Sequence, residues 1–138
     1  MKNSYLYSEL TDSIIKVFYL IYNHLGYGFL EKVYENAMAI ELLNSGLFIK
    51  TQQPVKIKYN GKEIGFYITD IIVNNCVIIE IKAAESLCEE HEAQLLNYLK
   101  ATDIEVGLLL NFGKKPQIKR KVFSKEYKPV AIKNHEES

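Results

Sequence analysis

Apolar side chains recur at intervals of three and four residues through the first third of the chain. They run from Leu10 to Leu25 and, after a break at residues 26–28 that contains two glycines, from Leu30 to Gly46. This spacing lines up apolar side chains on one side of a helix, and glycine is typical of the position just after a helix end. The pattern therefore predicts two amphipathic helices joined by a short turn.

In the middle of the chain the pattern changes to alternating and continuous apolar runs. Runs rich in Ile and Val are typical of buried strands, and Asn60-Gly61 is the strongest hairpin signal in the sequence. Residues 55–59 alternate between apolar side chains and lysines, which predicts an outer strand with one solvated face. The predicted strands are residues 47–49, 55–59, 68–73, 77–82, 106–112 and 118–123.

A helical pattern returns over residues 87–101, where Cys88, Leu95 and Leu99 form the expected inner stripe. The strand that follows, at residues 106–112, is reached through this helix and is therefore predicted to run parallel to a central neighbour. The predicted fold class is α/β, with a mixed central β-sheet flanked by helices on both faces.

Three charged side chains lie within the most apolar strands: Asp70, Glu80 and Lys82. A charge in a buried strand is costly unless it is paired or coordinated. Because side chains alternate along a strand, Glu80 and Lys82 project to the same side. The residues allow two interpretations, a buried ion pair that serves structure and an acidic pair that holds a divalent cation.

The place of Asp70 depends on the turn between its strand and the strand of Glu80. A two-residue turn at residues 74–75 would put Asp70 on the face away from Glu80. A three-residue turn at residues 74–76, or a single bulge, sets the two acids opposite each other with their Cβ atoms roughly 5 Å apart. We predict the odd-length turn or the bulge, which brings the carboxylates together.

Four short motifs stand in order along the chain. Residues 28–34 read GFLEKVY, Asp70 is followed ten residues later by Glu80-Ile81-Lys82, and residues 91–99 read HEAQLLNYL. Together they resemble the PD-(D/E)XK nuclease superfamily, whose core motif is D…(D/E)xK, and within it the GxxExxY proteins. The resemblance covers the chain from about residue 10 to residue 123. It departs from the pattern in that a threonine, not a proline, precedes Asp70.

This resemblance implies a restriction-endonuclease-like fold and a site for Mg²⁺ or Mn²⁺. It implies that Asp70, Glu80 and the backbone carbonyl of Ile81 bind the metal, with Glu31 as a further ligand, directly or through water. The residues themselves offer a simpler interpretation of Glu31, because a carboxylate in the first turn of a helix is favoured by the helix dipole.

The resemblance also implies roles for polar side chains around the acids. Lys82 would orient the attacking water or neutralise charge that develops on the phosphate. Gln94 and Tyr98 match the QxxxY feature of the exonuclease-like branch of the superfamily, and would touch a phosphate or a metal-bound water; an ordinary polar helix flank is the alternative. Tyr34 is expected to pack in the core with its hydroxyl hydrogen-bonded, and His91 is left out of the catalytic set.

The length of 138 residues predicts one domain over residues 1–138, with a basic segment at residues 114–133 and a frayed tail at residues 134–138. No apolar signal core and no run near the roughly 20 apolar residues of a membrane span is visible, so we expect a cytoplasmic protein with no membrane contact. Cys76 and Cys88 lack zinc spacing and are predicted to be free, small, buried residues.

The formal net charge is zero, but the charges are distributed unevenly. The basic segment contains only one acidic residue, Glu126, so a basic surface that holds phosphates is predicted there. Lysines that guard an edge strand are the alternative. The candidate nucleic-acid contacts are Lys114, Lys115, Lys119, Arg120 and Lys121.

Taken together, these features predict a metal-dependent nuclease that hydrolyses phosphodiester bonds, with DNA favoured over RNA as the nucleic-acid partner. One alternative is a non-catalytic module that keeps the nuclease fold and binds nucleic acid or a protein partner. A second is a structural homodimer in which the buried charges serve specificity alone.

Overall fold

The structure is a computed structural model that describes residues 6–127. The predicted tail at residues 134–138 and the part of the basic segment after residue 127 lie outside the described residues. In chain order the elements are α1 (Ser8–Leu25), α2 (Glu31–Asn44), β1 (Ile49–Tyr59), β2 (Lys62–Val73), β3 (Val77–Lys82), α3 (Glu89–Lys100), β4 (Val106–Phe112), β5 (Pro116–Val122) and the 3-10 helix η2 (Lys125–Tyr127).

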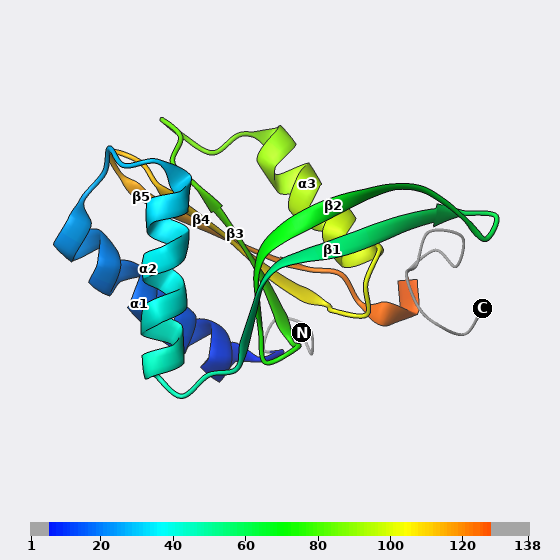
Figure 1. The fold of residues 1–138 in the computed structure, drawn as a ribbon, viewed down its shortest axis with the longest axis horizontal. Helices are drawn as coiled ribbons and strands as arrows, with labels where there is room; N and C mark the ends of the chain where they lie inside the picture. The colour runs from blue at the N-terminus through cyan, green and yellow to red at the C-terminus, as the bar shows by residue number, and fades with distance from the viewer. Residues whose placement is uncertain (1–5, 128–138) are drawn as a thin grey trace.

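The five strands form one mixed sheet in the order β1-β2-β3-β4-β5. Neighbouring strands are antiparallel except β3 and β4, which run parallel, as the helical connection between them predicts. Helices α1 and α2 lie on one side of the sheet and α3 on the other (Figure 1). The predicted α/β class, with a mixed sheet and helices on both faces, is confirmed.

Alternation along the central strands explains the two layers. Ile71, Ile79 and Ile81 belong to the core cluster that packs on α1 and α2, whereas Ile72 and Ile78 pack on α3. Because successive side chains point to opposite faces, strands that must satisfy both layers are apolar at almost every position. A charged side chain in these strands consequently lies between the sheet and the helix or helices that cover that face.

The break between α1 and α2 is fixed by Tyr34. Its side chain is fully buried, its hydroxyl donates to the backbone oxygen of Gly26 at 2.7 Å, and it accepts the N–H of Phe29 at 3.2 Å. The ring stacks on Phe112 of β4 with centroids 4.1 Å apart. The expectation that Tyr34 packs in the core is confirmed, and it sets where α2 starts.

The prediction of two short strands at residues 47–49 and 55–59 is wrong, because β1 is one strand of 11 residues. Gln52 adopts a left-handed conformation, with φ 53°, which kinks the strand without ending it. Pro54 stays in the ladder opposite Ile68, a position that an edge strand tolerates. The predicted turn at Asn60-Gly61 is confirmed, and both of its residues have positive φ.

The turn between β2 and β3 contains three residues, as predicted. Val73 pairs with Val77, and Asn74 and Asn75 both have positive φ, at 52° and 55°. The register continues through Ile71 opposite Ile79. One more step along this ladder places residue 70 opposite residue 80.

Two details of the cysteine prediction are wrong. Cys88 is exposed at the N-terminus of α3, so it does not join the fully buried Leu95 and Leu99 on the inner side of the helix, and Cys76 is only half-buried. Both thiols are free, as predicted.

Among the helices of residues 6–127, none has the length and apolar character of a membrane span.

Candidate functional site

Asp70 and Glu80 face each other where β2 leaves β3. The N–H of Asp70 donates to Oε2 of Glu80 at 3.1 Å, and the N–H of Ile81 donates to Oδ2 of Asp70 at 2.7 Å. Each carboxylate is therefore held by a backbone amide of the opposite strand. Glu80 is only 4% exposed, and Asp70 is half-buried. The pair is placed by main-chain geometry, which gives it little freedom to move.

The two acids are electrostatically strained. Burial, reinforced by the charges of Glu35 and Glu31, raises the pKa of Asp70 to about 6, against the opposing effects of the Ile81 N–H and the Lys82 ammonium. Burial and then the negative charge of Asp70 raise the pKa of Glu80 to about 9. Like charges in a desolvated position disfavour ionisation. A cation at this point would restore both carboxylates to their charged form.

Lys82 joins the acids from the end of β3. Its ammonium lowers the pKa of both carboxyl groups, and its Nζ donates to Oε1 of Gln94 on α3 at 3.3 Å. The structure thus brings together Lys82 and Gln94, two predicted site residues that are separated by a loop and the first turns of α3. Gln94 orients the lysine from the helical side of the site.

Tyr98 lies one helical turn after Gln94 and is 2% exposed. Burial raises the pKa of its hydroxyl, and the charges of Glu80 and then Asp70 add to the effect. Its ring lies 5.3 Å from the ring of Tyr67 on β2. Tyr98 therefore closes the site on the α3 side and stays a neutral hydrogen-bonding group at physiological pH.

On the α2 side, the structure separates two glutamates that the sequence places one helical turn apart. Glu31 is exposed, whereas Glu35 is 6% exposed and its Oε2 accepts the side-chain amide of Gln52. The exposed Lys32 lies 3.6 Å from the other oxygen of Glu35. The charge of Glu35 acts on both Asp70 and Glu80, whereas Glu31 contributes to Asp70 alone.

Sequence reasoning missed Glu35 and Gln52. The signal for Glu35 was its spacing, because positions 34, 38 and 42 of α2 are buried and position 35 falls beside them. Nothing in the sequence indicated the role of Gln52. Its backbone is left-handed within a strand, and glutamine is not a residue type that favours this conformation. By the ladder count, Gln52 stands opposite Asp70.

Asn111 of β4 is a third residue that the sequence did not single out. It is fully buried, its Oδ1 accepts the N–H of Ala84 at 2.8 Å, and its Nδ2 donates to the Ala84 carbonyl at 3.0 Å. Asn111 pairs with Lys82 across β3 and β4. It therefore fixes the chain directly after Lys82 and, through it, the entry into α3.

The side chains around Asp70 and Glu80 offer a limited set of metal ligands. Within residues 6–127, no group of three or more His, Cys, Asp and Glu side chains is gathered closely enough to hold a metal. The side chains supply two carboxylates, Asp70 and Glu80. This suits Mg²⁺, which takes oxygen ligands and keeps several waters, better than a metal that needs a closed protein cage.

The predicted basic contacts lie on and before β5, at the sheet edge away from β1. Arg120 donates to the backbone oxygen of Leu6, and Lys121 forms an ion pair with Glu92 of α3. These two side chains are therefore engaged in the fold. Lys114, Lys115 and Lys119 are exposed.

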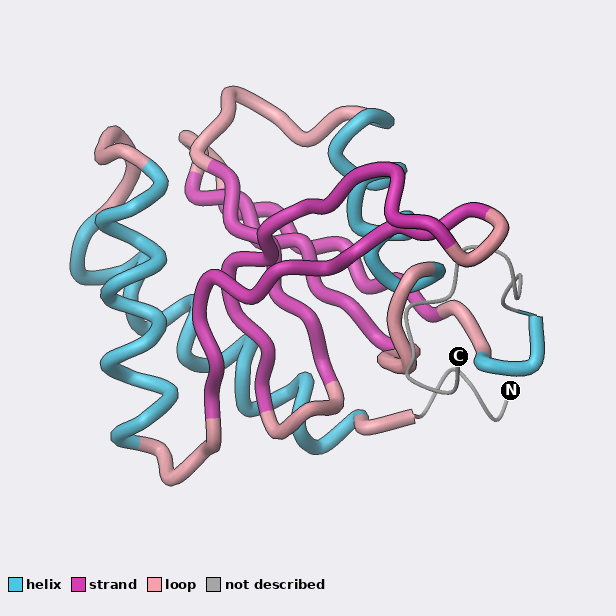
Figure 2. The backbone as a smooth tube through the Cα atoms, turned by 45° about the vertical axis from the view of Figure 1, so that its right-hand side comes forward, coloured by secondary structure: helices cyan, strands magenta, loops and turns pink. Residues whose placement is uncertain are grey.

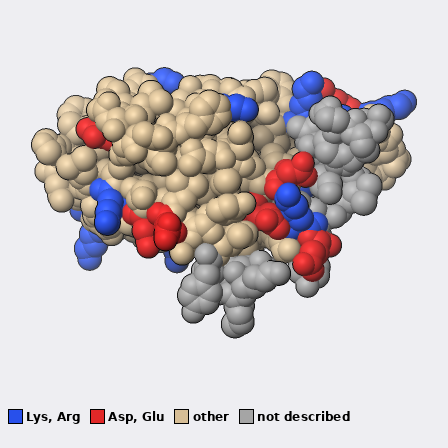
Figure 3. Space-filling model, turned by 90° about the horizontal axis from the view of Figure 1, so that it is seen from below, with Lys and Arg blue, Asp and Glu red and all other residues tan. Residues whose placement is uncertain are grey.

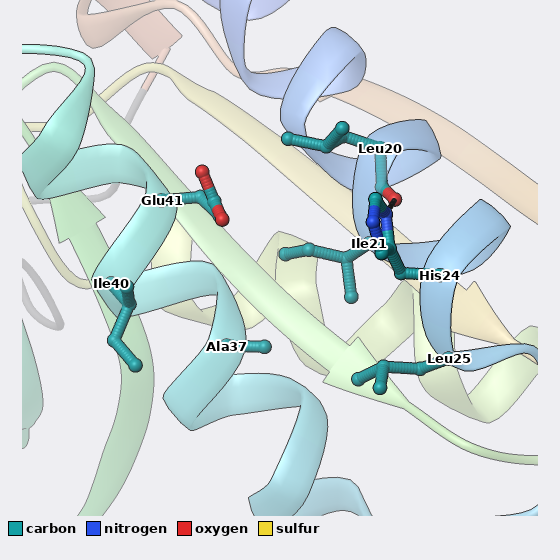
Figure 4. Close-up of a pocket in the computed structure, with 7 residues that line it drawn as sticks. All are labelled: Leu20, Ile21, His24, Leu25, Ala37, Ile40 and Glu41. Carbon is teal, nitrogen blue, oxygen red and sulfur yellow. Dashed lines mark hydrogen bonds between the residues drawn. The ribbon is translucent and has the colours of Figure 1, made fainter.

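An apolar groove of about 310 Å³ opens elsewhere, between α1 and α2. In Figure 4, Leu25 of α1 points toward Ala37 of α2, and Glu41 is the one carboxylate at the groove. With a single acid and no lysine, the groove lacks the chemistry found at Asp70 and Glu80. It is lined by Leu20, Ile21, His24, Leu25, Ala37, Ile40 and Glu41.

Comparisons with known proteins agree with this geometry. A sequence profile described as the PD-(D/E)XK nuclease superfamily matches residues 8–121. No curated protein matches the chain at a significant level. A solved structure titled "Crystal structure of SSO0001" is similar with a TM-score of 0.50 and 16% sequence identity, over 67% of this chain and 50% of that chain. This chain thus spans about half of that protein, and the likeness concerns the fold.

Proposed function

Because the chain belongs to the PD-(D/E)XK nuclease superfamily, we propose that it is a metal-dependent nuclease that hydrolyses phosphodiester bonds, of DNA in preference to RNA. The observation that supports this most is the pairing of Asp70 with Glu80 beside the ammonium of Lys82. Two acids can hold a metal ion that activates water as the nucleophile. A lysine beside them can stabilise the negative charge that develops on the phosphate.

In this proposal, Asp70, Glu80 and the backbone carbonyl of Ile81 would hold Mg²⁺ or Mn²⁺. The bound ion would supply Lewis-acid chemistry, which makes water a better nucleophile at neutral pH and offsets charge on the phosphate. The raised pKa values of both carboxyl groups support a cation at this place. Burial and mutual repulsion disfavour the two negative charges, and a bound cation would stabilise them. Glu31, being exposed, would act only through water.

The remaining polar groups would position the reactants. Lys82 would donate to a phosphate oxygen or orient the attacking water. Gln94, by accepting a hydrogen bond from the Lys82 ammonium, would hold that ammonium near the two acids. Tyr98, buried and neutral, would donate its hydroxyl toward the same space. Glu35, held by Gln52, would add negative charge behind Asp70 and so strengthen cation binding.

Nucleic acid would also meet basic side chains at a distance from the acids. We propose Lys114, Lys115 and Lys119 as phosphate contacts, since their side chains are exposed. Arg120 and Lys121 would contribute less, because one binds a backbone carbonyl and the other is paired with Glu92. The narrower resemblance to the GxxExxY proteins stays a prediction.

The experiment is a cleavage assay on end-labelled single- and double-stranded DNA and RNA, with Mn²⁺ or with EDTA. We expect cleavage only with the metal, and a loss of at least about 100-fold in Asp70→Asn and Lys82→Ala. Asp70→Asn is chosen because the amide oxygen can still accept the Ile81 N–H. Asp12→Asn, which changes an exposed carboxylate on α1, serves as the control that keeps activity.

Other outcomes separate the alternatives. Retarded migration of nucleic acid without cleavage, unchanged by Asp70→Asn, would support the non-catalytic binding module. Cleavage that survives EDTA or both substitutions would contradict the proposed site.

A further inference from the structure

The hairpin of β1 and β2 extends well beyond the sheet. β2 pairs with β3 only at residues 71–73, whereas its pairing with β1 continues to Tyr59 opposite Lys62. Residues 54–68, called the arm below, are therefore a two-stranded ribbon that projects from the body of the protein (Figures 1 and 2). The two faces of the arm differ in burial, although Tyr67 on the more covered face is still 41% exposed.

The covered face of the arm lies toward α3. Val55 is 2% exposed and pairs with Tyr67, whose ring contacts Tyr98 of α3. Residues directly opposite each other on paired strands share a face. This contact anchors the base of the arm and leaves the opposite face to solvent.

The solvent face carries a row of large apolar side chains. Ile64, Phe66 and Ile68 alternate along β2 and are 64%, 58% and 41% exposed. Alternation places Phe66 and Ile68 on one side of the ribbon, and Ile64 is the unpaired residue of a β-bulge next to them. A contiguous apolar row of this kind is unusual for a surface that meets only water and marks a binding site.

The same ribbon is basic. Lys56 pairs with Phe66 across the strands, so its ammonium stands beside the apolar row. Lys58 follows on the same side of β1 and pairs with Glu63, the single acid of the arm, whereas Lys62 pairs with Tyr59 at the tip. In Figure 3, Lys and Arg side chains lie at both ends of the molecule, and those at the right-hand end, toward which the arm projects in Figure 1, are interspersed with acidic side chains.

The row leads to the acidic pair. Ile68 precedes Asp70 by two residues on β2, a distance along the strand of roughly 7 Å. The other face of the arm reaches the same site through Tyr67 and Tyr98. A chain lying along the arm would consequently arrive at Asp70 and Glu80.

From these observations we propose that the arm binds a single strand of nucleic acid and presents it to the acidic pair, with Phe66 stacked on an unpaired base and Lys56 and Lys58 on the backbone phosphates. The inference rests on the proposed function for its ligand class. An aromatic ring can stack only on a base whose face is accessible, whereas a duplex offers phosphates and groove edges. A second copy of the chain fits the face less well, because twofold pairing would bring the lysines of both copies together.

The test is fluorescence anisotropy of the full chain in EDTA, with a labelled 20-nucleotide oligothymidine and a duplex of equal length. Binding energy from one stacked base predicts that Phe66→Ala weakens single-strand binding about 10-fold or more, with less than about a twofold effect on the duplex. Lys56→Ala should weaken binding and reduce its salt dependence.

Phe48→Ala is the matched control, because Phe48 is 55% exposed and lies beside the β2–β3 turn, where its N–H binds Oδ1 of Asn74. Its affinity should equal that of the unaltered protein. Circular dichroism confirms that each variant is folded. Because the assay is carried out in EDTA, it measures binding apart from the proposed metal-dependent cleavage.

Three results would overturn the proposal: no single-strand binding by the unaltered protein, equal binding by Phe66→Ala, or a dimer in sedimentation that Phe66→Ala dissociates. The last result would assign the face to a second copy. A protein that binds through Phe66 but never cleaves would overturn the proposed nuclease and leave the arm standing. If Phe66→Ala cleaves and binds like the unaltered protein, the proposed role of the arm would be overturned and the proposed nuclease would stand.

Discussion

Asp70 on β2 and Glu80 on β3 are held by reciprocal hydrogen bonds across the two strands. The N–H of Asp70 donates to the Glu80 carboxylate, and the N–H of Ile81, the residue after Glu80, donates to the Asp70 carboxylate. The arrangement places two buried acids on neighbouring strands, and the Lys82 ammonium offsets their negative charge only in part. It also makes their protonation part of the folding equilibrium, which gives the first prediction.

Metal-free protein should lose stability as the pH rises. The pKa of Glu80 is about 9 in the folded protein and near its ordinary value of 4.5 when unfolded, so the folded state binds the extra proton between these values. Stability is then fully present at or below pH 4.5 and is lost as the pH rises toward 9. Urea denaturation in EDTA at pH 5, 7 and 9 should show a loss above about 1 kcal/mol, the equivalent of one pKa unit.

Glu80→Gln should flatten this dependence, while Glu63→Gln, which alters an exposed acid, should leave it intact. A pH profile of the unaltered protein that rises or stays level over this range would contradict the burial of two like charges.

Divalent cations should stabilise the folded protein through the acidic pair. An ion that binds only the folded state at 100 times its dissociation constant adds about 2.7 kcal/mol. We expect Mn²⁺ to raise the urea midpoint of the unaltered protein at pH 8 and to have no effect on Asp70→Asn. An equal rise in that variant would place the ion elsewhere.

Glu35→Gln should make metal-free protein more stable at pH 8. The substitution keeps the shape and can still bond Gln52, but it removes a charge that repels the ionised Asp70, a gain on the order of 1 kcal/mol. Glu31→Gln, which changes an exposed acid acting on Asp70 alone, should give a smaller effect. The same Glu35→Gln variant should bind Mn²⁺ more weakly in isothermal titration, and unchanged affinity would remove Glu35 from the site.

Gln94→Ala should slow cleavage without changing metal affinity. Gln94 accepts from the Lys82 ammonium, and a hydrogen bond to a charged group is worth about 1.5–3 kcal/mol, so a loss in kcat of roughly 10-fold or more is expected. Asn97→Ala, at an exposed position of the same helix, is the control. A fall in Mn²⁺ affinity equal to the fall in rate would argue that Gln94 supports the metal and not the lysine.

Gly107→Ala tests the packing of α3 on β4. A Cβ at this position would lie 2.7 Å from Cδ1 and 3.0 Å from Cγ of the fully buried Leu95. Overpacking of this kind costs about 1–3 kcal/mol. Gly65→Ala, where no atom lies within 4 Å, should be near neutral. Thermal or urea unfolding of the two variants provides the comparison.

Most of the helices and strands were predictable from local sequence. Apolar spacing marked α1, α2 and α3, and glycine or asparagine marked the turns at Gly26, Asn60 and Asn74, because these residues reach positive φ at little cost. Where the local code was silent, the prediction failed. Residues 51–54 look like a loop, yet pairing with β2 along its whole length keeps them in β1.

For the site, the sequence determined which residues carry charge in buried strands and, through a three-residue turn, that Asp70 would meet Glu80. It also determined their neighbour Lys82, since strand alternation is fixed by the backbone. The tertiary structure alone decided that Glu35 and not Glu31 is the buried acid of α2, that Gln94 reaches Lys82, and that one face of the arm stays bare. These facts depend on how helices are set against the sheet, and the angle and depth of that packing arise from contacts between residues far apart in the chain.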